Sequence, residues 1–132
     1  MSVQKKLLTI IVPAYNVFEY IERCIRSLNY QSYMNFKIII VNDGSTDDTE
    51  EICKKYLSNG NIKYIYQENQ GMHGAHNTAY ENIDTELNVC IDSDDYMPDD
   101  AIEKILSFWN VNRNDKLAGI IALDAYESGE VI

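Results

Sequence analysis

Three aspartates stand within four positions of the chain, at Asp92, Asp94 and Asp95. They directly follow the mainly apolar run 87–91. Carboxylates this close together repel one another and raise each other's pKa unless a cation neutralises them. Oxygen ligands of this kind suit a hard divalent metal ion. An acidic turn also suits the start of a helix, so the spacing alone predicts either a metal site or a solvated turn.

Two further polar segments each follow an apolar run of the kind expected for a buried strand. They are residues 13–16, Pro-Ala-Tyr-Asn, and residues 42–48, Asn-Asp-Gly-Ser-Thr-Asp-Asp. Tyr15 could stack on a flat ring, and Asp43 could accept hydrogen bonds from a base N–H or a ribose hydroxyl. The simpler interpretations are that Tyr15 packs at a turn and that Asp43 belongs to a turn that starts a helix.

The hydrophobic pattern predicts the elements that position these segments. Strands are expected at 7–12, 36–41, 62–66, 87–91 and 117–123, with 62–66 at an edge or with a more exposed face, and residues 67–73 are expected to form a loop. The four predicted helices have inward stripes made of Phe18, Ile21, Cys24, Ile25 and Leu28, of Ile52, Cys53, Tyr56 and Leu57, of Ala75, Ala79, Tyr80 and Ile83, and of Ile102, Ile105, Leu106 and Trp109. Regular alternation of strand and helix indicates an α/β fold with a mainly parallel sheet and helices on its faces.

Polar residues also suggest where two of these helices begin. Asp47 with Glu50 three positions later is a helix-start signature, and Asp99 or Asp100 is expected to cap the last helix. Ligands of open parallel sheets bind beyond the carboxyl ends of the strands. The three polar segments are therefore expected to meet at one edge of the sheet.

Composition narrows the classes of protein that the chain can represent. Its 132 residues suit a single domain, with 45% hydrophobic and 24% charged residues. A net charge of −10 disfavours non-specific binding to nucleic acid or anionic lipid. If the substrate carries phosphate, a bound metal is the natural means of offsetting that charge. The apolar run after Lys5 and Lys6 is cut short by Pro13 with no small-residue cleavage site, so it is interpreted as a strand.

The sulfur and imidazole side chains show no spacing typical of zinc or redox sites. Cys24, Cys53 and Cys90 are far apart in apolar-periodic segments, so all three are predicted to be buried free thiols in a reducing compartment. His73 and His76 could form a metal pair, but no cysteine is expected nearby, which disfavours a zinc site.

Together the three polar segments resemble the signatures of family 2 glycosyltransferases. The residues that carry the resemblance are Thr9-Ile10-Ile11-Val12-Pro13-Ala14-Tyr15-Asn16, Val41-Asn42-Asp43-Gly44-Ser45-Thr46-Asp47 and Asp92-Ser93-Asp94-Asp95, in the family's order and rough spacing. The resemblance covers about Thr9 to Trp109. It implies the GT-A fold, a nucleotide-binding α/β sandwich, and transfer of a sugar from a nucleotide-sugar donor to an acceptor with inversion, usually with Mg²⁺ or Mn²⁺.

The resemblance also implies roles for individual residues. Pro13, Ala14 and Tyr15 would line the base pocket, and Asp43 would bind the base, most often uracil. Asp92, with Ser93 beside it, would contact the ribose or the metal shell, and Asp94 would ligate the metal that spans the two phosphates, with Asp92 in support. Asp95 is expected to support the turn and the next helix.

Two departures from the family pattern stand out. Family members commonly carry an arginine where this chain has His76, which would be a weaker and pH-dependent contact to the nucleotide. The family's general base is an acidic residue in the acceptor-binding half, expected beyond Ile132, and Asp124 and Glu127 follow the predicted fifth strand too closely to replace it. The chain is therefore expected to be the donor-binding portion of a longer enzyme. The implied acceptor is a glycan or a lipid-linked glycan, and the implied location is the cytoplasm, including the inner face of the membrane through parts outside this chain.

Three other classes of protein share parts of this pattern. A receiver-type signalling domain would need acids after the first and third strands and a lysine after the fifth, which this sequence lacks. A nucleotidyltransferase would ordinarily have a glycine-rich, basic phosphate loop near the first strand, and this sequence has none there. A binding module that keeps only the nucleotide site is the remaining alternative.

Overall fold

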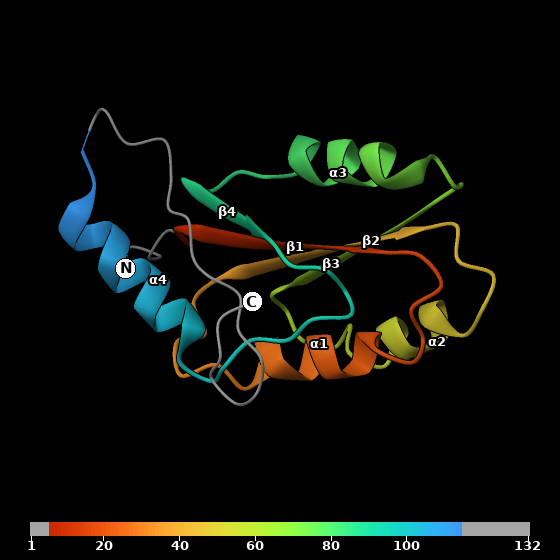
Figure 1. Ribbon diagram of the computed structural model, residues 1–132, viewed down its shortest axis with the longest axis horizontal. Coiled ribbons are helices and arrows are strands. Elements are labelled where there is room, and N and C mark those ends of the chain that lie inside the picture. Colours follow the sequence, from red (N-terminus) through yellow and green to blue (C-terminus); the bar gives the residue numbers. More distant parts are fainter. Residues whose placement is uncertain (1–5, 115–132) are drawn as a thin grey trace.

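A four-stranded parallel sheet lies between two layers of helices in the computed structural model, which describes residues 6–114 (Figure 1). The strands are β1 (Leu8–Ala14), β2 (Lys37–Asp43), β3 (Ile62–Gln67) and β4 (Leu87–Cys90). The helices are α1 (Ile21–Asn29), α2 (Thr49–Lys54), α3 (Gly71–Glu81) and α4 (Ala101–Asn112). The predicted α/β class is confirmed. The predicted strand 117–123 lies outside the described residues.

The strand order is β3-β2-β1-β4, with every pair parallel. The chain moves outward from β1 to β3 and then returns to place β4 on the other side of β1, so the order reverses between β1 and β4. Ligands of open α/β sheets bind at such a reversal, beyond the carboxyl ends of the strands. A receiver domain would place its third strand next to its first. The observed order therefore excludes that alternative.

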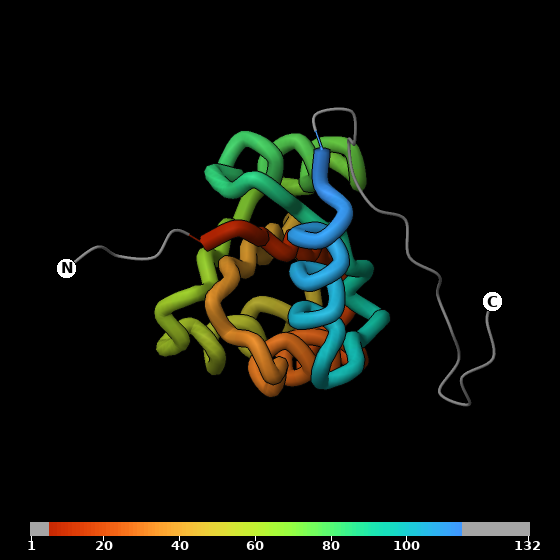
Figure 2. The backbone as a smooth tube through the Cα atoms, turned by 90° about the vertical axis from the view of Figure 1, so that its left-hand side faces the viewer, coloured from red at the N-terminus to blue at the C-terminus, as the bar shows by residue number. Residues whose placement is uncertain are grey.

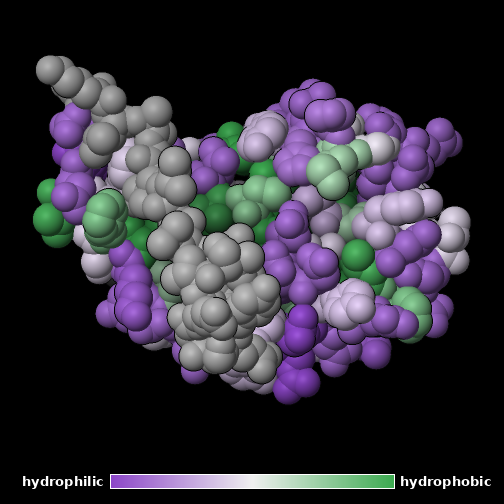
Figure 3. All heavy atoms as spheres, in the orientation of Figure 1, coloured by the Kyte–Doolittle hydropathy of each residue, from purple (hydrophilic) through white to green (hydrophobic). Residues whose placement is uncertain are grey.

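Alternating residues of the central strands bury against opposite helical layers. Ile10 and Val12 of β1 belong to the larger core, which includes residues of α1 and α4. Ile11 belongs to a smaller core with two alanines of α3. Figure 2, turned by 90° from Figure 1, shows the same division, with α3 on one face of the sheet and α1 on the other. In Figure 3, hydrophilic side chains cover α3, and apolar ones are visible mainly between the helical layers.

The first two strands extend two residues further than predicted, into the polar motifs. Hydrogen bonding to the neighbouring strand carries them on, with Pro13 opposite Val41 and Ala14 opposite Asn42. Pairing of β1 with β4 ends at Ile11, so Pro13 lies where β1 has one neighbour instead of two. Such a position tolerates the missing N–H of proline.

Some predicted details of the helices are wrong. Residues 67–73 are not one loop, because β3 continues to Gln67 and α3 already begins at Gly71. Phe18, Leu57 and Tyr80 are exposed instead of buried, since the helices are shorter or rotated relative to the apolar pattern. Helix α4 follows Asp100 as predicted, although no side-chain cap bond forms there. No described helix has the length and apolar character needed to cross a membrane.

Candidate functional site

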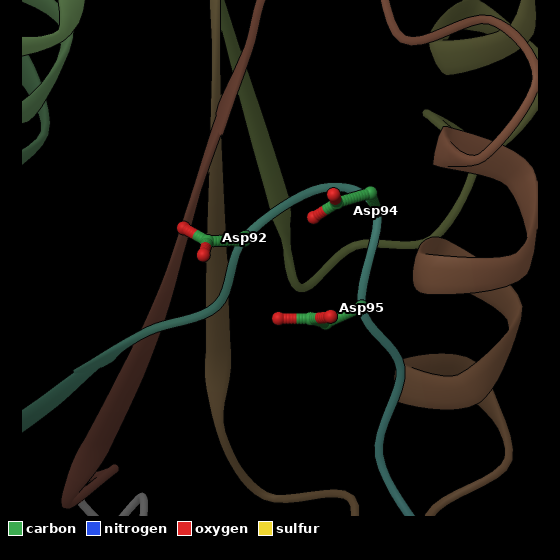
Figure 4. Close-up of side chains that lie close together, drawn as sticks. All are labelled: Asp92, Asp94 and Asp95. Carbon is green, nitrogen blue, oxygen red and sulfur yellow. The ribbon is translucent and has the colours of Figure 1, made fainter. Parts of the chain in front are cut away.

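The three aspartates form a cluster of carboxylates in the turn that follows β4. One ligand oxygen from each of Asp92, Asp94 and Asp95 lies within 4.8 Å of the others, and all three residues are exposed. The Asp95 N–H donates to the Asp92 carbonyl at 2.9 Å, which folds the segment back on itself. Figure 4 shows the three side chains extending from this turn to the same side, away from α1. We call residues 92–95 the acid turn.

Asp95 joins this cluster, whereas the sequence predicted only a supporting role for it. Within residues 6–114, the carboxylates of Asp92 and Asp94 form no hydrogen bond or ion pair with another residue. Ser93, between them, is buried. Exposed and buried side chains therefore alternate along the turn, with Asp92 and Asp94 exposed on either side of Ser93. Three hard oxygen donors converging from one turn are a chemically suitable ligand set for Mg²⁺ or Mn²⁺.

Side chains of α1 contact the backbone of the acid turn. The Cys24 Sγ lies 4.0 Å from the Asp92 carbonyl, and Arg23 donates from Nη2 to the Asp94 carbonyl at 3.0 Å. Burial raises the pKa of the Cys24 thiol to about 12, with further contributions from the negative charges of Asp95 and Asp94. Cys24 is therefore an inert packing thiol, as predicted, and Cys53 is equally buried.

Asp43 has an environment opposite to that of the acid turn. It is 3% exposed, at the end of β2. Its Oδ1 accepts hydrogen bonds from the Gln67 side chain and from the Gln70 N–H, each at 2.9 Å. The Asn69 side chain donates to the Asp43 carbonyl at 2.9 Å and lies 3.3 Å from Oδ2. Asp43 thus holds the segment between β3 and α3 in place, so its role is larger than that of a residue that only starts a turn.

Gly44 is required next to Asp43. Its φ is +74°, a left-handed conformation that favours glycine. A Cβ placed there would lie 2.7 Å from the backbone nitrogen of Asn69. The close approach of these two backbones brings Asn69 within reach of Asp43.

The segments after β1 and β2 are joined by reciprocal hydrogen bonds. Asn16 Oδ1 accepts from the Thr46 N–H at 2.8 Å, and the Asn16 N–H donates to Ser45 Oγ at 3.0 Å. Asn16 has φ +51°, a conformation in which asparagine is enriched among non-glycine residues. The neighbouring Tyr15 is 51% exposed, while Pro13 is half-buried and Ala14 is buried. Tyr15 therefore presents its ring to solvent and does not serve as core packing.

A second set of bonds strengthens the same junction. The Val17 N–H donates to Thr49 Oγ1 at 3.0 Å, and the Phe18 N–H donates to Asp47 Oδ2 at 3.4 Å. Burial alone would raise the pKa of Asp47, but hydrogen bonds from the Thr49 hydroxyl and N–H outweigh it and hold that pKa below its usual value. The predicted pairing of Asp47 with Glu50 is not what starts α2, because Asp47 bonds to Thr49 and to the segment after β1.

His76 lies on α3, against the end of β4. Its Nδ1 lies 2.8 Å from the Met72 carbonyl, so this nitrogen carries a proton, and its Nε2 lies 3.3 Å from Cys90 Sγ. Partial burial of the sulfur raises the pKa of the Cys90 thiol, and the negative charge of Asp92 raises it further. Cys90 is exposed, which corrects the prediction that all three thiols are buried. The inference that no cysteine lies near the histidines is also wrong, because β4 brings position 90 beside position 76.

Sequence reasoning missed the residues that support the predicted site. Gln67 and Asn69 were assigned to a featureless loop, yet they donate hydrogen bonds to Asp43. The position of Asn16, directly after the exposed Tyr15 and at the end of a strand, was the available signal that the chain turns sharply there.

A parallel α/β sheet with polar groups gathered at its carboxyl edge defines a class of nucleotide-binding folds. The family model described as "Glycosyl transferase family 2" matches residues 9–130 of this chain. The chain therefore belongs to glycosyl transferase family 2, as the three motifs predicted.

Curated relatives agree with this assignment. The chain is 42% identical over 106 residues to glycosyltransferase GlyA of Streptococcus pneumoniae, a match that covers 80% of this chain and 15% of that protein. It is 40% identical over 99 residues to the putative glycosyltransferase EpsH of Bacillus subtilis, covering 74% of this chain and 29% of EpsH. The chain thus spans less than a third of the length of either relative.

Solved structures show the same fold. TarS of S. aureus, residues 1–349 in complex with UDP, superposes with a TM-score of 0.75 at 30% identity, covering 80% of this chain and 32% of that fragment. The same TarS fragment in complex with UDP-GlcNAc gives a TM-score of 0.75 over 80% of this chain and 31% of the fragment. The mannosyltransferase PcManGT of Pyrobaculum calidifontis, solved with GDP-Man and Mn²⁺, has a TM-score of 0.72 at 24% identity, covering 80% of this chain and 33% of its own, and shows the fold alone. The GT-A fold that the sequence implied is confirmed.

Proposed function

We propose that this chain is the donor-binding part of a glycosyltransferase that takes a sugar from a nucleotide-diphosphate sugar, with UDP as the nucleotide. The observation that carries the proposal is that two kinds of carboxylate follow strands of one sheet at its carboxyl edge. Asp43 is buried and hydrogen-bonded, and the acid turn is exposed. Relatedness to TarS, whose structures contain UDP and UDP-GlcNAc, supports the choice of nucleotide.

The base side of the site is assigned to the segments after β1 and β2. Tyr15 offers an exposed ring for stacking, with Pro13 and Ala14 forming the wall behind it. Asp43 accepts a hydrogen bond from the base through Oδ2, whose protein contact to Asn69 is long at 3.3 Å. His76 contributes an imidazole at the position where the family commonly has arginine.

The phosphate side is assigned to the acid turn. Asp94 and Asp92 would hold Mg²⁺ or Mn²⁺, with Asp95 as a further ligand and Ser93 packing the turn. When bound, the metal supplies Lewis-acid stabilisation of the departing diphosphate, where the largest negative charge develops. Without a cation, a chain with net charge −10 would repel a diphosphate.

Membership of the family supports proposals for the remaining features of the reaction. We propose inversion at the anomeric carbon and an acceptor that is a glycan or a lipid-linked glycan. No residue within 6–114 is assigned as the general base. Cytoplasmic chemistry at the inner face of a membrane is proposed for the lipid-linked case, with membrane contact made by parts other than this acidic segment.

Calorimetric titration of the chain with UDP, with and without Mn²⁺, tests the proposal. We expect metal-dependent binding that is lost in Asp94→Ala. The matched control is Glu81→Ala, which removes an exposed acid at the last residue of α3. Equal UDP binding by the wild type and Asp94→Ala would refute the metal assignment. Preference for GDP or dTDP would refute the choice of base.

Nucleotide binding alone would also be expected of a module that keeps only the nucleotide site. Release of free UDP from UDP-sugars separates the two cases when the full-length protein is tested with an acceptor. Metal-dependent release that disappears in Asp94→Ala is the outcome expected of a transferase.

A further inference from the structure

Helix α1 and the residue two positions past its end present a stripe of three polar side chains to the segment that follows β4. The residues are Arg23, Ser27 and Gln31, spaced four apart, so they lie along one side of the helical path. We call them the α1 stripe.

Each member of the α1 stripe bonds to the backbone of the segment that contains the acid turn. Arg23 Nη2 donates to the Asp94 carbonyl at 3.0 Å, and Ser27 Oγ accepts from the Met97 N–H at 3.1 Å. Gln31 Nε2 donates to the Pro98 carbonyl at 2.7 Å, and Gln31 Oε1 accepts from the Ile102 N–H at 3.1 Å. The segment between β4 and α4 forms no helix or strand, and the side chains of the α1 stripe supply hydrogen bonds to its backbone.

The stripe residues are themselves held in place. Ser27 Oγ donates to the Cys24 carbonyl at 2.7 Å, and Gln31 Nε2 donates also to the Ser27 carbonyl at 2.9 Å. The Arg23 guanidinium lies over the Tyr96 ring, with 4.5 Å from Cζ to the ring centroid. Because stacking fixes the plane of the guanidinium, little freedom is lost when it bonds to Asp94.

The three contacts differ in burial. Gln31 is 5% exposed and joins the segment to the start of α4, so it serves mainly the fold. Arg23 is exposed and reaches the carbonyl of a residue in the carboxylate cluster itself. Its contact therefore acts on the position of the Asp94 carboxylate at little cost to the core.

We propose that Arg23 is a positioning residue for the acid turn, which fixes Asp94 in the geometry that a divalent cation requires. This inference rests on the proposed function. The positive charge of Arg23 and its positioning role predict opposite effects of Arg23→Gln on the affinity for the metal. As a neighbouring positive charge, Arg23 repels a cation, so its removal would tighten metal binding. As a positioning group, it orders a ligand, so its removal weakens metal binding.

Titration of the chain with Mn²⁺ at saturating UDP tests the proposal. We expect Arg23→Gln to weaken the apparent Mn²⁺ affinity by about tenfold, the effect typical of groups that orient metal ligands. Arg23→Lys keeps the charge but not the planar fork, and it is expected to restore only part of the affinity. Arg26→Gln removes the same charge from an exposed position of the same helix and is expected to leave Mn²⁺ affinity unchanged.

Thermal unfolding without metal is the control for fold, and it should give equal midpoints for the two glutamine variants. Tighter or unchanged Mn²⁺ binding in Arg23→Gln would overturn the positioning role while leaving the proposed function intact. Absence of Mn²⁺-dependent UDP binding in the wild type would overturn the proposed function, and this inference with it.

Discussion

Asp43 and the acid turn lie at the same edge of the sheet, yet their carboxylates have opposite environments. Asp43 follows β2, is 3% exposed and accepts hydrogen bonds from two residues of the neighbouring segment through one oxygen. The carboxylates of Asp92, Asp94 and Asp95 follow β4, are exposed and gather within 4.8 Å of one another. The first carboxylate is stabilised by hydrogen bonds from the protein, whereas carboxylates gathered this closely repel one another and favour a bound cation.

This difference indicates two kinds of rigidity in one site. The base side is built before any ligand arrives, because Asp43, Gly44 and Asn16 connect three segments through hydrogen bonds and close backbone contact. On the phosphate side, α1 fixes the backbone, while the carboxylates of Asp92 and Asp94 form no ion pair within residues 6–114. Mutations on the base side should therefore reduce folding stability, and mutations in the acid turn should affect ligand binding alone.

The largest effect on stability is expected from Asp43→Ala. Its removal takes the acceptor from the Gln67 amide and the Gln70 N–H in partly buried bonds, and loss of hydrogen bonds to a charged group costs about 2 kcal/mol. Urea unfolding at pH 7 measures the free energy of unfolding directly.

Asp43→Asn is the matched control for that variant. Its side-chain oxygen can still accept from both donors, so the loss should be about 1 kcal/mol. Equal destabilisation by the two variants would show that the negative charge matters more than the hydrogen bonds, contrary to the comparison drawn above.

A smaller loss is expected from Gly44→Ala. Alanine pays about 1–2 kcal/mol in the left-handed region, and its Cβ would press on the Asn69 backbone. Since that backbone belongs to the segment bonded to Asp43, UDP affinity should fall together with stability. Gly60→Ala is the control, because a Cβ at Gly60 meets nothing within 4 Å. A Gly44→Ala protein with wild-type urea midpoint would mean that the two backbones separate easily.

The smallest effect on the metal-free protein is expected from Asp94→Asn. Removing one of three clustered charges relieves repulsion, so the melting temperature without metal should stay the same or rise slightly. Addition of Mn²⁺ with UDP should raise the melting temperature of the wild type but not that of the variant, because only a bound ligand stabilises by mass action. A marked loss of stability without metal would show that the acid turn, like Asp43, is held by its own carboxylates.

The local pattern of apolar and polar residues was enough to predict the buried strands and the polar motifs that follow them. The apolar runs around Ile10 and Ile39 predict strands buried on both faces, because such burial demands continuous apolar sequence, and both residues are buried. The three polar segments were expected at one edge because parallel strands all end there. Prediction failed where a residue's environment depends on a distant segment. Cys90 was predicted to be buried by its apolar neighbours, but β4 leaves it exposed beside His76.

The sequence by itself therefore determined the α/β class, the family and the clustering of Asp92, Asp94 and Asp95, because strand burial and adjacent charges are properties of neighbours along the chain. Only the tertiary structure decided that Asp43 is buried among donors from beyond β3, that Asn16 joins two segments, and that Arg23 reaches the acid turn 71 positions away. These contacts depend on the strand order β3-β2-β1-β4, which brings distant segments together and leaves no trace in local hydrophobic pattern.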